Sequence, residues 1–167
     1  MPEDGRRYEL YDGEVFLVPA PLPRHHIVQI LLLEMLRNYA KEHGGLALGS
    51  PLDIVFSDHN VLQPDIVYFT PARAHLVDLD RVIRDAPDLC IEVLSPSTAA
   101  TDRGKKMQVF ARYGVGEYWI VDPRSERIEV HKLTNGEYLL QTSATGDDHV
   151  RSLAVPAHTF VARSAFP

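Results

Sequence analysis

The spacing of hydrophobic and polar residues changes several times along the chain and predicts strands in some segments and helices in others. Short apolar-rich runs at residues 8–11 and 14–18 flank Asp12-Gly13, a dipeptide typical of a two-residue β-hairpin turn. In that register Glu9 and Glu14 lie on the same face of the hairpin. From residue 24 to about residue 42 apolar side chains recur every three to four positions, which predicts an amphipathic helix.

The middle of the chain predicts β-strands joined by polar turns. Each strand is a short apolar run bounded by Gly, Pro, Asp or Ser residues. We expect strands at residues 46–48, 53–56, 61–69 and 89–94. The segment between the last two, residues 70–87, is polar and predicts a connector with one helical turn near residues 80–83.

The last third of the chain predicts a helix followed by further strands. The helix spans about residues 102–113 and ends at Gly114. A strand at 117–121, a hairpin of 128–133 with 138–142, and a short terminal piece at 160–162 follow. The order of elements predicts an α/β fold, a mixed β-sheet flanked by helices with N-terminal and C-terminal β-hairpins. The length of 167 residues predicts a single domain, residues 1–167.

Two of the predicted strands each carry one carboxylate among apolar residues. Asp65 lies in the string QPDIVYF (63–69), and Glu92 lies in DLCIEVLS (88–95). An ionised carboxylate inside an apolar run costs several kcal/mol unless it is paired or bound to a metal. Ordinary explanations remain for each: Asp65 caps a turn or pairs with an arginine, and Glu92 has a structural arginine partner. Alternatively, the two acids belong to one site.

The predicted helix at 102–113 brings a lysine close to these acids. At about 100° per residue, Lys106 lies at the edge of the apolar face beside Phe110, whereas Lys105 lies on the opposite side. We therefore expect Lys106 to reach back toward the sheet and Lys105 to be solvated. Asp102 precedes Lys106 by four residues and is expected to be a helix N-cap or its i,i+4 partner. Two acids with a nearby lysine suit metal-assisted hydrolysis of a phosphodiester.

Composition limits the classes of protein that fit. Lys and Arg total 17 against 23 Asp and Glu, a formal net charge of −6, which gives no support to an extended basic nucleic-acid-binding surface. A locally positive cleft or a dimer groove remains compatible with a nuclease. No secretory leader pattern is visible, and the longest apolar stretch, 27–36, is too short to span a bilayer. The single cysteine, Cys90, lies in an apolar strand. We expect a cytoplasmic protein with no membrane association.

Several strings in this sequence, in order and over nearly the whole chain, resemble one known family. They are YELYDGEV (8–15), Arg24-His25, QPD (63–65), IEVLSPST (91–98), DRGKK (102–106) and GVGEYWIVD (114–122). The chain resembles the Uma-type family of bacterial restriction endonucleases, within the PD-(D/E)xK nuclease superfamily. Leu94 stands where the superfamily motif has its lysine. The resemblance implies that this lysine has moved to the following helix, where Lys106 matches.

The resemblance also implies roles for the candidate residues. Asp65 and Glu92 carry over as ligands of Mg²⁺ or Mn²⁺, with the backbone carbonyl of Val93 as a third ligand. Lys106 carries over as the residue that orients or deprotonates the attacking water. Glu14 matches a family glutamate that completes the site, and Glu9 on the same hairpin face is the alternative.

The function that these expectations favour is metal-dependent endonuclease cleavage of DNA. A catalytically silent nucleic-acid-binding or assembly module of the same fold is the alternative from a different class, and the acidic charge balance leans toward it. A third alternative is hydrolysis of RNA or of a smaller phosphodiester, which the same residues would serve. Because one active site per chain cuts one strand, cleavage of both strands of a duplex suggests a homodimer.

Overall fold

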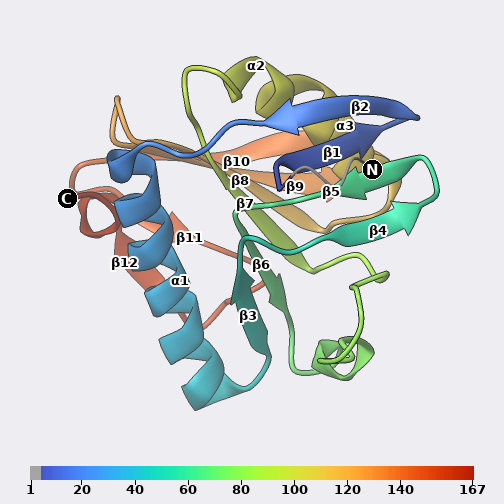
Figure 1. The fold of residues 1–167 in the computed structure, drawn as a ribbon. Coiled ribbons are helices and arrows are strands. Elements are labelled where there is room, and N and C mark those ends of the chain that lie inside the picture. Colours follow the sequence, from blue (N-terminus) through green and yellow to red (C-terminus); the bar gives the residue numbers. More distant parts are fainter. Residues whose placement is uncertain (1–4) are drawn as a thin grey trace.

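The computed structural model describes residues 5–167, and a six-stranded mixed sheet forms its centre (Figure 1). Its strands, in spatial order, are β10 (Glu137–Thr145), β9 (Arg127–Thr134), β8 (Glu117–Asp122), β7 (Leu89–Val93), β6 (Ile66–Phe69) and β3 (Leu46–Gly49). β7 and β8 run parallel, and the other neighbouring pairs run antiparallel. The predicted mixed α/β architecture is confirmed.

A four-stranded antiparallel sheet contains the N-terminal hairpin. Its order is β2 (Glu14–Val18), β1 (Arg7–Tyr11), β5 (Asn60–Leu62) and β4 (Ile54–Ser57). The hairpin has the predicted register, with Glu9 opposite Phe16 and Tyr11 opposite Glu14. Both turn residues have positive φ, 50° at Asp12 and 88° at Gly13, which is the requirement of a type I′ turn.

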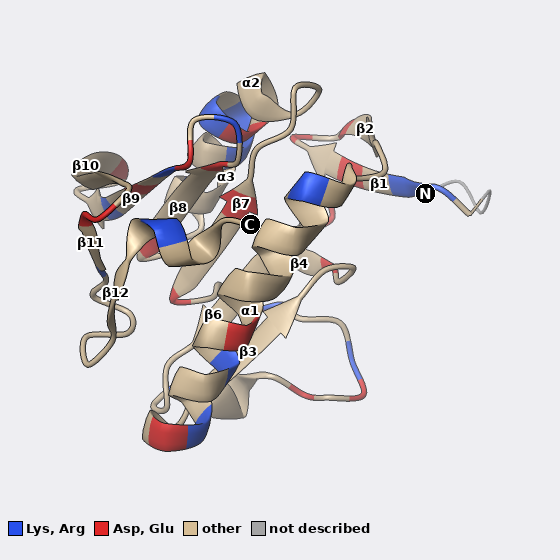
Figure 2. Cartoon of the chain, turned by 90° about the vertical axis from the view of Figure 1, so that its left-hand side faces the viewer, with Lys and Arg blue, Asp and Glu red and all other residues tan. Residues whose placement is uncertain are grey.

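Helices cover both faces of the six-stranded sheet. The long helix α1 (Pro23–His43) packs on one face together with the C-terminal segment, and Val28, Leu32 and Leu36 form its buried stripe. On the other face lie the four-stranded sheet and one continuous helical stretch, made of α2 (Ala99–Thr101), η2 (Asp102–Lys106) and α3 (Met107–Arg112). Figure 2 shows a basic position near the start of α1 and both acidic and basic positions over its second half. None of the helices within residues 5–167 is long and apolar enough to cross a membrane.

Three expectations about element boundaries were wrong. The strand predicted at 61–69 is interrupted at residues 63–65, so β5 and β6 belong to different sheets. Pro64 has no backbone N–H to donate to a strand ladder, which explains the break. The helical turn expected near residues 80–83 lies instead at η1 (Ala74–Leu76), and Ile83 forms a parallel bridge with Ile54. The helix expected from residue 102 begins at Ala99.

The C-terminal segment forms a third, two-stranded sheet and a terminal turn. β11 (His149–Arg151) pairs with β12 (Thr159–Val161), and η3 (Ala162–Ala165) follows. β11 was not predicted. A buried carboxylate attaches this segment to the central sheet: Glu117 accepts hydrogen bonds from Trp119 Nε1 at 2.6 Å, Ser152 Oγ at 2.6 Å and the Leu153 N–H at 2.7 Å.

Replacing Glu117 by alanine is therefore expected to lower the free energy of unfolding by about 3 kcal/mol or more, because three donors would lose their acceptor in or near the core. Urea unfolding monitored by Trp119 fluorescence measures the change. Glu137→Ala, at an exposed position of β10, is the matched control and is expected to change stability by less than about 0.5 kcal/mol. Equal effects of the two substitutions would contradict the structural role of Glu117.

Candidate active site

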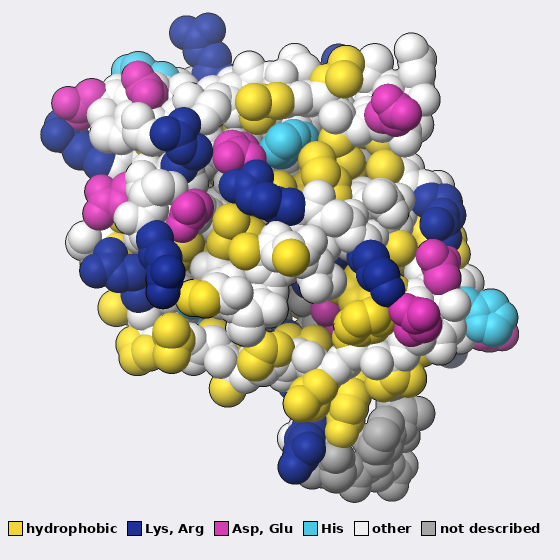
Figure 3. All heavy atoms as spheres, turned by 90° about the horizontal axis from the view of Figure 1, so that it is seen from above, with side chains coloured by type: hydrophobic (Ala, Val, Ile, Leu, Met, Phe, Trp, Pro, Cys, Tyr) yellow, Lys and Arg dark blue, Asp and Glu magenta, His cyan; other side chains and the backbone are white. Residues whose placement is uncertain are grey.

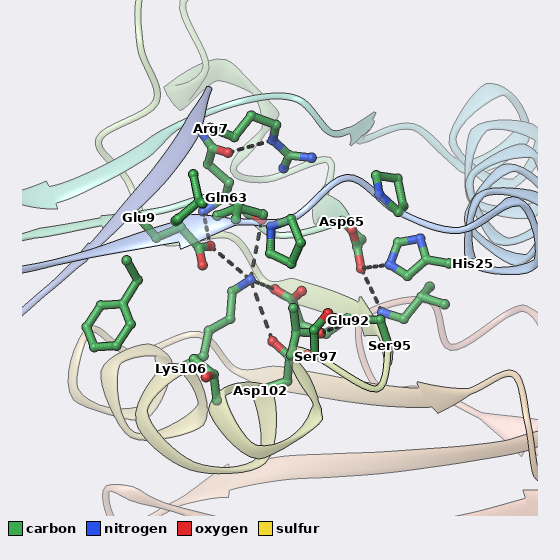
Figure 4. A pocket seen from close by; sticks show the side chains of 18 residues that line it. Arg7, Glu9, His25, Gln63, Asp65, Glu92, Ser95, Ser97, Asp102 and Lys106 are labelled. Carbon is green, nitrogen blue, oxygen red and sulfur yellow. Dashed lines mark hydrogen bonds and ion pairs between the residues drawn. The ribbon is translucent and has the colours of Figure 1, made fainter. Parts of the chain in front are cut away.

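The break between β5 and β6 lies beside the end of β7 and the helical stretch, and five charged residues meet there (Figure 4). Glu9 comes from β1, Asp65 from the β5–β6 link, Glu92 from β7, and both Asp102 and Lys106 from η2. All five are between 3% and 8% exposed. Because Glu92 lies on the same face of the strand as Cys90 and Leu94, it faces the helix and the four-stranded sheet. The strands, the β5–β6 link and η2 thus place these charged side chains around a buried pocket.

Lys106 is the centre of this cluster. Its Nζ lies 2.8 Å from Oε1 of Glu92 and 2.9 Å from Oε1 of Glu9. Asp102 Oδ1 is 3.9 Å away, and the backbone carbonyl of Gln63 accepts a longer hydrogen bond of 3.4 Å. The expected placement of Lys106 toward the sheet is confirmed, and so is its i,i+4 pairing with Asp102. Asp102 is not an N-cap, because the helix already begins at Ala99.

The helix has a π turn where the two lysines diverge. η2 spans Asp102–Lys106, within which hydrogen bonds run from residue i to i+5. The exposed Lys105 pairs with Glu14 at 2.7 Å and lies over the Phe16 ring. One turn of helix therefore sends adjacent lysines to opposite environments, one solvated and one buried.

Four acids lie in the cluster with one lysine, and the Lys106 ammonium group pairs with three of them, Glu9, Glu92 and Asp102. Burial alone would lower the pKa of Lys106, but the attraction of Glu9 and Glu92 raises it well above its ordinary value. Burial raises the pKa of Glu92 well above its ordinary value despite the attraction of Lys106, and repulsion from Asp65 adds to the rise. Burial likewise raises the pKa of Asp102 to about 6. The ammonium group of Lys106 therefore does not offset the cost of burying the ionised forms of Glu92 and Asp102 beside the other acids.

Glu9, rather than Glu14, belongs to the cluster. Oε1 of Glu9 contacts Lys106 and accepts a 2.7 Å hydrogen bond from the Gln63 N–H, and Oε2 accepts a 2.6 Å bond from the Tyr11 hydroxyl. Glu14 shares the hairpin face, but it lies two residues nearer the turn on the paired strand, about 6–7 Å along the ribbon. Its side chain is 67% exposed and does not line the pocket. The structure does not bring Glu14 to the place where it was expected to complete the site.

Asp65 is held by groups other than the lysine. Its Oδ2 accepts a 2.8 Å hydrogen bond from the Val93 N–H and lies 3.1 Å from Nε2 of His25 in the first turn of α1. His25 was not among the residues expected in the site. The signal was present, because His25 shares a helical face with the buried Val28 and Leu32. Val93 lines the pocket as expected, while the ligand role of its carbonyl stays a prediction.

A polar chain connects the pocket rim to the four-stranded sheet. Gln63 Nε2 donates to Asp53 at 2.7 Å, and Gln63 Oε1 accepts from Arg7 Nε at 2.8 Å. Arg7 thereby presents a guanidinium group to the pocket beside the acids (Figure 4). The pocket has a volume of about 180 Å³ and is closed on one side by β2 and the segment after it, including Phe16, Leu17 and Pro19.

Carboxylate oxygens are the donors that Mg²⁺ and Mn²⁺ prefer, and a cation would offset the repulsion among the buried acids. Within residues 5–167, however, no three acidic, histidine or cysteine side chains are gathered into a ready metal-binding group. Lys106 Nζ contacts both Glu9 and Glu92, and Asp65 contacts His25. The donor chemistry of Asp65 and Glu92 therefore fits a divalent cation, and binding requires these side chains to draw together.

The mixed sheet, with acids at neighbouring strand ends and a lysine on the next helix, defines a protein of the restriction-endonuclease-like fold. A solved structure described as a putative nuclease belonging to DUF820, from Anabaena variabilis, matches this fold with a TM-score of 0.82 at 21% sequence identity, over 99% of this chain and 93% of that chain. The chain belongs to the Uma2 family, whose description is "Putative restriction endonuclease" and whose model matches residues 1–162.

A relative in Synechocystis sp. is similar to most of this chain. It is the uncharacterized protein slr1290, which is 28% identical to this chain over 148 residues, or 84% of this chain and 74% of the relative. The similarity therefore includes both acid-bearing strands and is not confined to one motif.

Proposed function

We propose that this protein is a nuclease that hydrolyses DNA phosphodiester bonds with the help of Mg²⁺ or Mn²⁺. The observation that carries the proposal is the buried cluster of Asp65, Glu92 and Lys106 in a member of a restriction-endonuclease family. Cleavage of both strands of a duplex would need two such sites, so the proposal includes a homodimer.

In the proposed mechanism Asp65 and Glu92, with the Val93 carbonyl, hold the cation. When bound, the cation polarises the scissile phosphodiester and stabilises the charge that develops on it. Lys106 has a raised pKa and two acid partners in the metal-free site, which favour its protonated form. In that form its ammonium group donates hydrogen bonds that orient the attacking water, and it offsets phosphate charge.

Glu9 and Arg7 have supporting roles in this proposal. Glu9 contacts Lys106 but is itself fixed by Tyr11 and the Gln63 N–H, so it positions the lysine. Arg7 is held at the pocket rim through its Nε. Within residues 5–167 its two terminal nitrogens have no hydrogen-bond partner, and in this proposal they bind a phosphate. This local positive charge matters, because Lys and Arg side chains are interspersed with acidic ones over the face seen in Figure 3 and the chain has a net charge of −6.

The test is incubation of supercoiled plasmid with purified protein in Mg²⁺ or Mn²⁺. We expect nicked or linear products in either metal and none after EDTA, since removal of the cation leaves the buried acids to repel the phosphate. Parallel reactions with single-stranded DNA and RNA identify the substrate class. Binding of DNA without cleavage in both metals would contradict the proposal and favour a catalytically silent nucleic-acid-binding module.

A further inference from the structure

Resting on the proposed metal-dependent function, we propose that His25 is a positioning residue that fixes the Asp65 carboxylate for the metal ion. His25 contributes no bond to the ion in this proposal. It acts through Nε2, which lies 3.1 Å from Oδ2 of Asp65. The proposal adds helix α1 to a site otherwise built from two sheets and the helical stretch after β7.

Asp65 needs external support because its own segment lacks a strand ladder. It follows Pro64 in the link between β5 and β6. Its backbone carbonyl accepts hydrogen bonds from the Ser50 N–H at 2.8 Å and from Gln29 Nε2 at 2.9 Å. Gln29 lies one turn after His25 on the same face of α1. Thus α1 holds both ends of Asp65, its carbonyl through Gln29 and its carboxylate through His25.

Both contacts of the carboxylate are to the same oxygen. In the part of the chain that the structure describes, Oδ2 is contacted by the Val93 N–H and by His25, while Oδ1 is engaged by neither. Two donors converging on Oδ2 fix the plane of the carboxylate, and Asp65 lines the pocket (Figure 4). A carboxylate presented in one orientation loses less side-chain freedom when it binds a cation.

The surroundings of the other ring nitrogen of His25, Nδ1, support a role for the contact between Nε2 and Asp65. An ionised carboxylate only accepts hydrogen bonds, so Nε2 carries a proton in this contact. Nδ1 is buried and has no hydrogen-bond partner among residues 5–167. An unpaired buried nitrogen is costly, and an apolar side chain would fill the same space on the Val28–Leu32 face without that cost. The pairing of Nε2 with Asp65 accounts for a histidine at this position.

The test compares His25→Leu with His25→Gln, whose amide N–H can reproduce the Nε2 donor. Calorimetric titration with Mn²⁺ is expected to give a 10- to 100-fold weaker dissociation constant for His25→Leu, a typical loss when a hydrogen-bonding partner of a metal ligand is removed. His25→Gln should remain within about threefold of the wild-type protein. The matched control is His26→Leu at the exposed neighbouring position, which should leave the affinity unchanged.

A second readout needs no metal. In the ¹⁵N spectrum of the metal-free protein we expect the His25 ring as the Nε2–H tautomer, with its signals shifted by Asp65→Asn. Equal Mn²⁺ affinity of His25→Leu and wild type, or an Nδ1–H tautomer, would overturn the proposal. Electron paramagnetic resonance of the Mn²⁺ complex showing a coordinated nitrogen that is lost in His25→Gln would also overturn it. Failure of the proposed nuclease function is distinguishable, since DNA would remain intact while Mn²⁺ affinity still depended on His25.

Discussion

Glu92→Gln is expected to slow DNA cleavage by at least about a thousandfold, equivalent to roughly 4 kcal/mol of transition-state stabilisation. Glutamine has nearly the shape of glutamate, so the packing beside Cys90 and Leu94 is preserved. The substitution removes the charge that would bind the cation. Lys106 retains Glu9 at 2.9 Å, so its ammonium group stays in place.

The same substitution should not destabilise the protein. Burial raises the pKa of Glu92, and Asp65, Asp102 and Glu9 each repel its charge, so the neutral amide costs less to bury. We expect the melting temperature at pH 8 to be unchanged or higher, a separation of activity from stability that is typical of functional residues. Glu14→Gln, at an exposed acid outside the pocket, is the control and should cut at the wild-type rate. Cleavage by Glu92→Gln within tenfold of wild type would contradict the assignment.

Local signals in the sequence predicted the elements well and their grouping less well. Asp12-Gly13 fixed the hairpin register because a type I′ turn permits only one pairing of its flanking residues. The division of the apolar run at 61–69 into two strands was harder to predict, because periodicity does not show to which sheet a strand belongs. Pro64 was the available signal for a break between the two sheets. β11 has three residues, too few for a periodic pattern.

The candidate site was predictable where an energetic argument constrained a side chain. A glutamate inside an apolar strand and a lysine at the edge of an apolar helical face each require a partner, and the structure pairs Glu92 with Lys106. Strand alternation placed Glu9 and Glu14 on one face of the hairpin. It did not show which of the two lies far enough from the turn to reach the site. The contact of His25 with Asp65 joins residues 40 positions apart in different elements, which local patterning does not encode.

Lys106→Met is the second substitution with a large expected effect, and its signature is pH-dependent. Methionine fills the volume but leaves Glu9, Glu92 and Asp102 buried without a cation. Breaking a buried pair in this way typically costs about 3–5 kcal/mol, and we expect that loss at pH 8. DNA cleavage should also be lost, since no ammonium group remains to orient water.

The sign of the pH effect follows from the acids. In the wild-type protein burial already raises the pKa of Glu92, and that of Asp102 to about 6, and loss of Lys106 removes the attraction that restrains both. A carboxyl whose folded pKa lies above its unfolded value stabilises the fold below the unfolded pKa and loses that contribution as the pH rises through the folded pKa. The destabilisation by Lys106→Met should therefore be small near pH 4 and grow through pH 6 and above.

Lys105→Met provides the matched comparison on the same turn of helix. Its pair with Glu14 is largely exposed, so we expect a loss below about 1 kcal/mol with little pH dependence, and normal cleavage.

Adding Glu92→Gln to Lys106→Met should recover part of the stability at pH 8 but not the activity, because one unpaired charge is removed while the catalytic group stays absent. Urea unfolding between pH 4 and 8 measures the free energy of unfolding of each variant. A pH-independent loss in Lys106→Met would mean that packing, rather than unpaired buried charge, accounts for the role of Lys106 in the fold.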